Sequence, residues 1–454
     1  MGDRPERVAG GRGLRRAAVV ASSRVGDSKY ARWALAGASL ISDRVWTLGD
    51  GSQARRVYRE RREVTHSKRG HSQVGVVTSV VVLTVAAHVP LFLVIALSSR
   101  ITRHHGLTET AFGLAFSIYF LASAAFSPAA GRIVESRGLY VSFGTSAAVA
   151  VISLIGLASG AYSVVVFMVS FVFAGFGATV VQSASAGALV LHAHSGNQGL
   201  AFGIKQAAIP LTAMISGAAV PVLLPLTTWP VLLVLAAGCC GLAFVAARVF
   251  QSAQAPPQPF RGGSELPPLE DRMVLAALTT GAMFSAIPAS AGVSFLVLSA
   301  EANGVSMNSA ALVLSAASLG GIIVRVILGL VADRSQSVGI SSVASCVLIG
   351  GIGFASLAFA SDLGSIVASA VVALSAGWGW SGLFALAVVK RYSAFASRVT
   401  GITQAGMYLG GVVGPVVFGL VVSRWGYSVA WLVTSASAGA GGGLLLAAQS
   451  VVRR

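Results

Sequence analysis

Charged side chains are scarce in this chain of 454 residues. Only 10% of the residues are charged, whereas 55% are hydrophobic and the mean hydropathy is +0.79. A soluble globular domain carries charge on about a quarter of its residues. The scarcity excludes a soluble protein and indicates a chain with many membrane-spanning segments.

Acidic residues are scarcer still, with 15 Asp and Glu against 32 Lys and Arg. None lies deep inside an apolar segment, and the acidic residues nearest to such segments all stand at segment ends: Glu109, Glu135, Glu301, Asp333 and Asp362. A pump for cationic compounds needs carboxylates inside the membrane to balance the charge of its substrate. The sequence therefore argues against such a pump.

Cysteine is also rare, and catalytic motifs are missing. The three cysteines, Cys239, Cys240 and Cys346, lie in apolar segments. Adjacent cysteines have poor geometry for a disulfide, and the spacing fits no metal site. The chain contains no Walker loop, HExxH or GxSxG motif. We therefore expect no metal, no cofactor and no enzymatic activity.

Apolar runs of helical length are what the chain has in abundance. From residue 74 onward these runs follow one another, and each can cross about 30 Å of hydrocarbon as a helix. The predicted helices are 74–99, 109–130, 139–160, 162–191, 199–224, 229–250, 273–300, 308–331, 338–360, 364–389, 400–422 and 427–448. We expect an all-α membrane protein with two six-helix bundles, at 73–250 and 272–454, joined by a hydrophilic linker at 251–271.

The first 72 residues are basic and contain no run long enough to span a bilayer. They hold 16 Lys and Arg against 7 Asp and Glu, which is 16 − 7 = +9 of the net charge of +17. A disordered cytoplasmic tail, or translation begun upstream of the true start, is one interpretation. The basic block at 55–62 leaves two others open, contact with anionic lipid or with nucleic acid. We favour the tail and expect no nucleic-acid partner.

The charges of the predicted loops set the orientation. If both termini are cytoplasmic, eleven Lys and Arg of 73–454 fall on the cytoplasmic side and only Arg100, Arg103 and Arg424 fall outside. This distribution obeys the positive-inside rule. It predicts a multi-pass protein of the inner (plasma) membrane.

An internal duplication organises the apolar part. GRIVESRG at 131–138 has a counterpart, GLVADR at 329–334, and the offset of 329 − 131 = 198 also relates the GIKQ at 203–206 to the GITQ at 401–404. A fixed offset of glycine, carboxylate and turn indicates a duplicated half.

The duplicated element resembles the loop between helices 2 and 3 of the major facilitator superfamily of transporters, over about residues 73–454. The resemblance implies a substrate site between the two bundles, lined by helices 1, 4, 7 and 10, and transport by alternating access. It also implies a conformational latch formed by Gly131, Glu135, Arg137, Gly138, Gly329, Asp333 and Arg334. The first copy departs from the family pattern, with Glu135 in place of aspartate and Ser136 in place of a basic residue.

Two charged residues lie inside predicted helices, where a charge is costly and is a candidate for function. Arg325 stands two turns before Asp333, and an arginine in helix 8 resembles the carboxylate-binding residue of the monocarboxylate-transporter branch, although the helix 1 signature of that branch is not evident. Bracing of the helix end is the alternative. Lys205 is the second candidate, with its ammonium group extended to the membrane surface as the alternative.

Uncharged candidates complete the expected substrate site or gate. His88 could protonate near neutral pH or be a hydrogen-bonded core residue. The paired glutamines and the aromatic residues of helices 4 and 10 could contact substrate or simply pack: Gln206, Gln404, Phe176, Trp378 and Trp380.

We therefore expect a monomeric secondary transporter. Its partners are the lipid bilayer and a small organic anion, with a monocarboxylate as one candidate, or a polar metabolite. Protons are the candidate coupling ion, as in symport. Two alternatives remain open, efflux of hydrophobic drug-like compounds and a non-transporting receptor or scaffold on the same fold.

Overall fold

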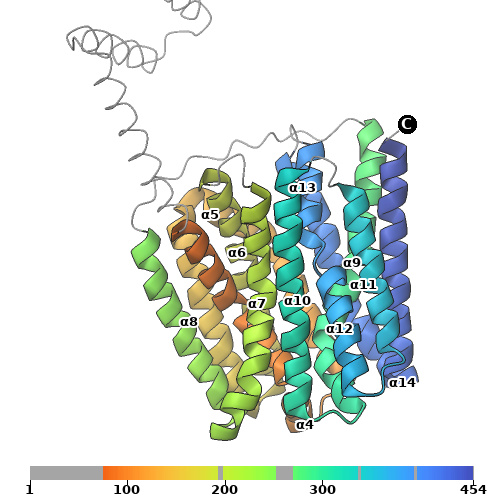
Figure 1. Cartoon of the computed structure of the whole chain (residues 1–454). Helices are drawn as coiled ribbons and strands as arrows, with labels where there is room; N and C mark the ends of the chain where they lie inside the picture. Colours follow the sequence, from red (N-terminus) through yellow and green to blue (C-terminus); the bar gives the residue numbers. More distant parts are fainter. Residues whose placement is uncertain (1–74, 193–197, 252–268, 336–338, 393–395, 453–454) are drawn as a thin grey trace, which may run out of the picture. The chain divides into compact units, whose positions relative to one another are not determined.

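The structure is a computed structural model that describes residues 75–192, 198–251, 269–335, 339–392 and 396–452. The chain divides into two units at residues 71 and 72. The first unit, which contains nearly all of the predicted tail, lies outside the described residues, as does most of the predicted linker. The described part of the second unit is all-helical (Figure 1).

The helices follow the predicted order. The first half contains a helix over Gly75–Ala96, α4 (Ser98–His105), α5 (Glu109–Ser159), η1 (Gly160–Tyr162), α6 (Val164–His192), α7 (Gln198–Leu223), η2 (Leu224–Leu226) and α8 (Trp229–Gln251). The second half contains α9 (Leu269–Ala302), α10 (Met307–Arg334), α11 (Ile340–Leu357), α12 (Leu363–Gly377), α13 (Ser381–Arg391) and α14 (Ala396–Val452).

Two of these helices each supply two membrane spans. Ten helical segments of the described residues are long and apolar enough to cross a bilayer, and two of them have 54 and 52 residues. A 54-residue helix would measure about 80 Å, more than twice the hydrocarbon thickness. Both contain a glycine with non-helical backbone angles, Gly138 (φ 78°) in α5 and Gly426 (φ 82°) in α14. A positive φ suits glycine, which has no Cβ, so each glycine divides its helix and the ten segments make twelve spans.

The helix predicted over 364–389 is interrupted. The structure forms α12 up to Gly377 and α13 from Ser381, with a turn at 378–380. The sequence prediction missed this break because tryptophan and glycine continue the apolar run without proline or charge.

The two halves meet along two seams. In the first, α7 packs against α10 along its length, and the two helices lie side by side in Figure 1. In the second, the first span of α5 packs against α14, where Ser117 Oγ donates to the carbonyl of Val412 at 2.6 Å. In lipid, helices are held together by close packing and hydrogen bonds rather than by the hydrophobic effect.

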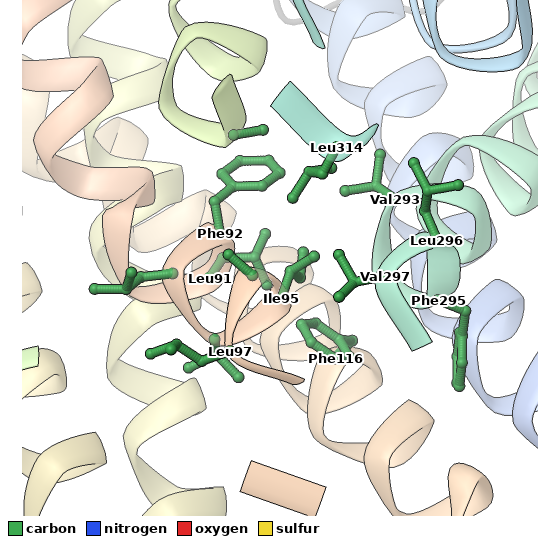
Figure 2. Close-up of a cluster of buried hydrophobic side chains, with 14 of the residues drawn as sticks. Leu91, Phe92, Ile95, Leu97, Phe116, Val293, Phe295, Leu296, Val297 and Leu314 are labelled. Atoms are coloured by element: carbon green, nitrogen blue, oxygen red, sulfur yellow. The ribbon is translucent and has the colours of Figure 1, made fainter. Parts of the chain in front are cut away.

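An apolar cluster fills the space between the halves near the end of the first helix. Side chains from four helices point toward one another there in Figure 2, including Phe92 and Ile95 of the first helix, Phe116 of α5, Val297 of α9 and Leu314 of α10. All five are fully buried. The halves are therefore in contact at this end.

Candidate functional site

The two ends of the helical unit are each joined across the halves, and we name them by a charged residue. The Asp333 end contains the C-terminus of α10 and the N-terminus of α7. The Arg103 end contains α4 and the C-terminus of α9. The charge rule predicts that the Asp333 end is cytoplasmic.

At the Asp333 end, a carboxylate of one half caps a helix of the other. Asp333 of α10 accepts hydrogen bonds from the backbone N–H groups of Gly199 at 2.6 Å and Leu200 at 2.7 Å, in the first turn of α7. These N–H groups have no partner within α7, and the helix dipole favours a negative charge at this position. One carboxylate thus satisfies two donors of the other half.

Glycines allow this close approach. A Cβ at Gly199 would lie 2.6 Å from the carbonyl oxygen of Gly329, and a Cβ at Gly203 would lie 2.7 Å from that of Arg325. Any side chain at these positions would push α7 away from α10. Gly329, which the duplication singled out, therefore contributes close packing next to Asp333.

The first copy of the duplicated motif forms no such contact with the described residues. Glu135 and Arg137 are exposed at the end of the first span of α5, and no hydrogen bond or ion pair joins either of them to the described part of the chain. Gly131 has open space around it, and Gly138 forms the turn described above. The latch role of this copy stays a prediction, as does that of Arg334, which is exposed.

At the Arg103 end, an ion pair joins the halves. Arg103 Nη2 lies 3.7 Å from Glu301 Oε2, with the side chains 67% and 18% exposed. A second contact across the halves joins Thr110 Oγ1 of α5 and Ser423 Oγ of α14, which are 3.0 Å apart. Sequence reasoning missed both contacts because neither is part of a motif. The separation of 3.7 Å is long and Arg103 is exposed, so this pair resembles surface ion pairs, which stabilise by only about 0–1 kcal/mol.

Two histidines lie next to the ion pair on α4. His104 Nε2 is 2.8 Å from the carbonyl oxygen of Ala161, and the rings of His104 and His105 are 4.9 Å apart. Burial lowers the pKa of His105, and the neighbouring His104 lowers it further. His105 is therefore held in its neutral form more strongly than a free histidine.

Arg325 lies between the two ends and is 3% exposed. Its guanidinium donates to the carbonyl oxygens of Gly321, at 3.2 Å, and of Trp378, in the turn between α12 and α13. Its Cζ lies 4.8 Å from the centroid of the Trp378 ring. Its Nε is buried without a hydrogen-bond partner in the described residues.

An aromatic contact connects Arg325 to the other half. The Trp378 ring is 5.7 Å from Phe92, and Phe92 is 6.5 Å from His88. His88 Nδ1 is 2.7 Å from the carbonyl oxygen of Thr84. The structure thus brings Arg325, Trp378 and His88 into one row. Phe92 was missed in the sequence, although it stands one helical turn after His88.

Lys205 is the second buried cation. It is 7% exposed and lies close enough to His88 for the two side chains to interact electrostatically. No ion pair joins Lys205 or Arg325 to a carboxylate of the described residues. A buried charge without a counter-charge costs several kcal/mol.

The paired glutamines occupy equivalent places on the two seams. Gln206 Nε2 lies 3.5 Å from Ser381 Oγ of the other half. Gln404 lies close to the hydroxyl of Tyr408, which is 3.3 Å from Thr179 Oγ1 of the other half. Ser381 and Thr179 differ by 381 − 179 = 202, the offset that relates AGWG at 376–379 to AGFG at 174–177. Both glutamines thus belong to polar contacts across the halves.

The remaining aromatic candidates lie apart from this row. Phe176 packs against Phe126 with ring centroids 5.2 Å apart. Trp380 is buried and donates from Nε1 to the carbonyl of Gly377 at 3.0 Å. Of the three predicted aromatic residues, only Trp378 contacts Arg325.

A crevice of about 10 Å³ remains beside Arg325, lined by Gln206 and by glycines of α7, α10, α13 and the turn before α13. This volume holds about one water molecule. The helices α7 and α10 are thus closely packed beside Arg325. No group of three or more His, Cys, Asp or Glu in the described residues could hold a metal ion.

These observations define the class of the protein. It is a multi-pass helical membrane protein whose two halves meet at joined ends, with cations buried near the seam. A sequence model of the major facilitator superfamily matches residues 80–393. The chain belongs to this superfamily and is a secondary transporter rather than an enzyme.

Solved structures agree with the fold. A bacterial homologue of the human lysosomal transporter Spinster, in an inward-facing and occupied conformation, is similar with a TM-score of 0.61 and 13% identity, over 83% of this chain and 96% of that one. The nucleoside transporter NupG is similar with a TM-score of 0.65 and 12% identity, over 82% and 99%. No curated protein sequence matches the chain. At these identities the likeness shows the fold and leaves the substrate undetermined.

Proposed function

We propose that this transporter carries a small organic anion by alternating access, and that Arg325 binds the anionic group. One observation carries the proposal: Arg325 and Lys205 are buried in the transmembrane part without a carboxylate partner among the described residues. A bound anion would supply the missing negative charge, and a guanidinium can hold a carboxylate through two parallel hydrogen bonds.

The position of Arg325 supports this assignment. Its side chain lies near the seam between the halves, where alternating access would open the site first to one end and then to the other. The unpartnered Nε–H is a hydrogen-bond donor available to a ligand. Trp378 and Phe92 would surround the apolar part of the substrate. Coupling to protons stays a prediction.

Counterflow in proteoliposomes tests the proposal. Vesicles loaded with an unlabelled anion should accumulate the same anion in labelled form, whereas vesicles without protein should not. Acetate, lactate, succinate and a neutral nucleoside make a suitable panel, because they vary charge at small size. Accumulation of the nucleoside alone would refute an anion transporter, and no accumulation of any solute would favour a receptor or scaffold.

A further inference from the structure

The span formed by α12 and α13 is broken at residues 378–380, and the break leaves backbone groups that need partners. The last carbonyls of α12 have no helical N–H to accept from, because α13 begins only at Ser381. In a membrane such groups must find partners within the protein. Gly377 accepts from the indole of Trp380, and Trp378 accepts from the guanidinium of Arg325.

Arg325 therefore fastens the break to α10. One of its nitrogens donates to Gly321 of α10 and another to Trp378 of the break, while its guanidinium plane covers the Trp378 ring. These contacts come from one side chain. The remaining nitrogen, Nε, is buried and unpartnered beside the crevice.

The segment beyond the break, α13, makes one polar contact with the other half and two within its own half. Ser381 faces Gln206 of the other half, Lys390 Nζ lies 3.5 Å from the carbonyl oxygen of Ala332, and Arg391 pairs with Asp271 at 3.4 Å. Each of these is a long or partly exposed contact and is weak on its own. A movement of α13 at residues 378–380 would break them while leaving α12 in place.

We propose that the Arg325–Trp378 contact is a lock on α13 and that a bound anion opens it. The proposal rests on the anion-transport function proposed above. An anion forms stronger hydrogen bonds with a guanidinium than a neutral carbonyl does, so it competes for the nitrogen that holds Trp378. Once the carbonyl is released, α13 moves as a separate half-helix, and its contact with Gln206 of the other half, beside the occupied site, is lost.

The local residues suit such a hinge. Residues 378–380 form a turn between α12 and α13, in which Trp378 and Trp380 keep right-handed backbone angles. Gly379 packs so closely under the carbonyl of Ser375 that a Cβ would collide with it, and a Cβ at Gly382 would lie 3.2 Å from Gln206 Cγ. The break is thus built from small residues on both sides of Trp378 and Trp380.

Hydrogen–deuterium exchange of the purified full chain tests the lock. In Arg325→Gln the amides of α13 should exchange severalfold faster than in the wild type, while those of α12 stay unchanged. Lys205→Gln is the matched control: it removes the other buried cation, which makes no contact with the break, so α13 should exchange as in the wild type. If Arg325→Gln does not fold, Arg325→Lys replaces it in this test. Lysine keeps the positive charge but cannot hold the carbonyl oxygens of Gly321 and Trp378 together as the guanidinium does.

Release by the anion is tested on the wild type with acetate and with inorganic phosphate as probes. Whichever probe raises the melting temperature should also raise exchange in α13, and it should have no such effect in Arg325→Gln. If a probe stabilises the protein but leaves the hydrogen–deuterium exchange of α13 unchanged, the anion binds without releasing α13, and the release step is refuted. Unchanged α13 exchange in folded Arg325→Gln, or a uniform rise across α11, α12 and α13, overturns the lock. Failure of all anions to bind or be transported refutes the proposed function instead.

Discussion

Removal of the Asp333 charge is expected to shift the conformational equilibrium of the transporter. In Asp333→Asn the side chain keeps one acceptor oxygen for the N–H groups of Gly199 and Leu200, and it loses its negative charge at the N-terminus of α7. Asp333→Asn therefore loses one of the two hydrogen bonds that the side chain accepts from α7, and it also loses the favourable interaction of its charge with the dipole of α7.

The expected magnitude follows from these two terms. The loss of a capping interaction costs about 0.5–2 kcal/mol and the loss of a charge near a helix N-terminus about 0.3–1 kcal/mol. Asp333 is exposed, so the lower half of the combined range applies. A change of about 1 kcal/mol shifts the ratio of closed to open states at the Asp333 end about fivefold. The bonds join the two halves, so their loss acts on that equilibrium and not only on folding.

Spin-label distances measure this shift. Cys239, Cys240 and Cys346 are first replaced, and labels are placed at Ser136 and Val331, which are exposed near the Asp333 end on the two halves. The variant should show a larger population at long distance than the wild type.

Asp362→Asn is the matched control for this experiment. Asp362 also caps a helix N-terminus, but within its own half, where it accepts from Gly364 and Ser365. Its loss should lower stability without changing the distances. Identical distance distributions in Asp333→Asn and wild type would refute the latch.

Three further outcomes are expected. A cytoplasmic reporter fused within residues 251–271 should be active and an external reporter should be active after His104; an external signal from the linker would contradict the twelve-span topology. Deletion of residues 2–70 should leave membrane insertion and transport intact, as measured in membrane fractions and vesicles. Since the pKa of His105 is lower in the folded protein than the ordinary histidine value, the unfolded state binds more protons below about pH 6.5; thermal stability should fall as the pH drops below that value, and less so in His105→Gln.

The sequence predicted the spans because each depends on a local property, the length of an apolar run. Gly138 and Gly426 fall where the predicted helices are separated, although the chain stays helical up to Gly138 rather than forming a loop from residue 131. The break at 378–380 could not be predicted, because its stabilising partner, Arg325, comes from another helix. The superfamily and the fold are confirmed by the comparisons.

The candidate site was predicted in part. Arg325 and Lys205 could be selected from the sequence because a charge inside an apolar segment is costly. Asp333 and Gly329 could be selected because they belong to the duplicated motif. The contacts that these residues make could not be predicted, because a sequence motif does not show which helix packs against it. The first turn of α7, which Asp333 caps, contains no side chain that signals the contact, and the Arg103–Glu301 pair depends on how two distant helix ends meet.

Anion affinity of purified Arg325→Gln tests the central claim most directly. Isothermal titration would use the anion with the strongest effect on the melting temperature of the wild type. A charged hydrogen bond contributes about 1.5–3 kcal/mol, so affinity should fall by about 10- to 100-fold, while circular dichroism shows the helical content unchanged. Affinity equal to that of the wild type in the folded variant would contradict an anion site at Arg325.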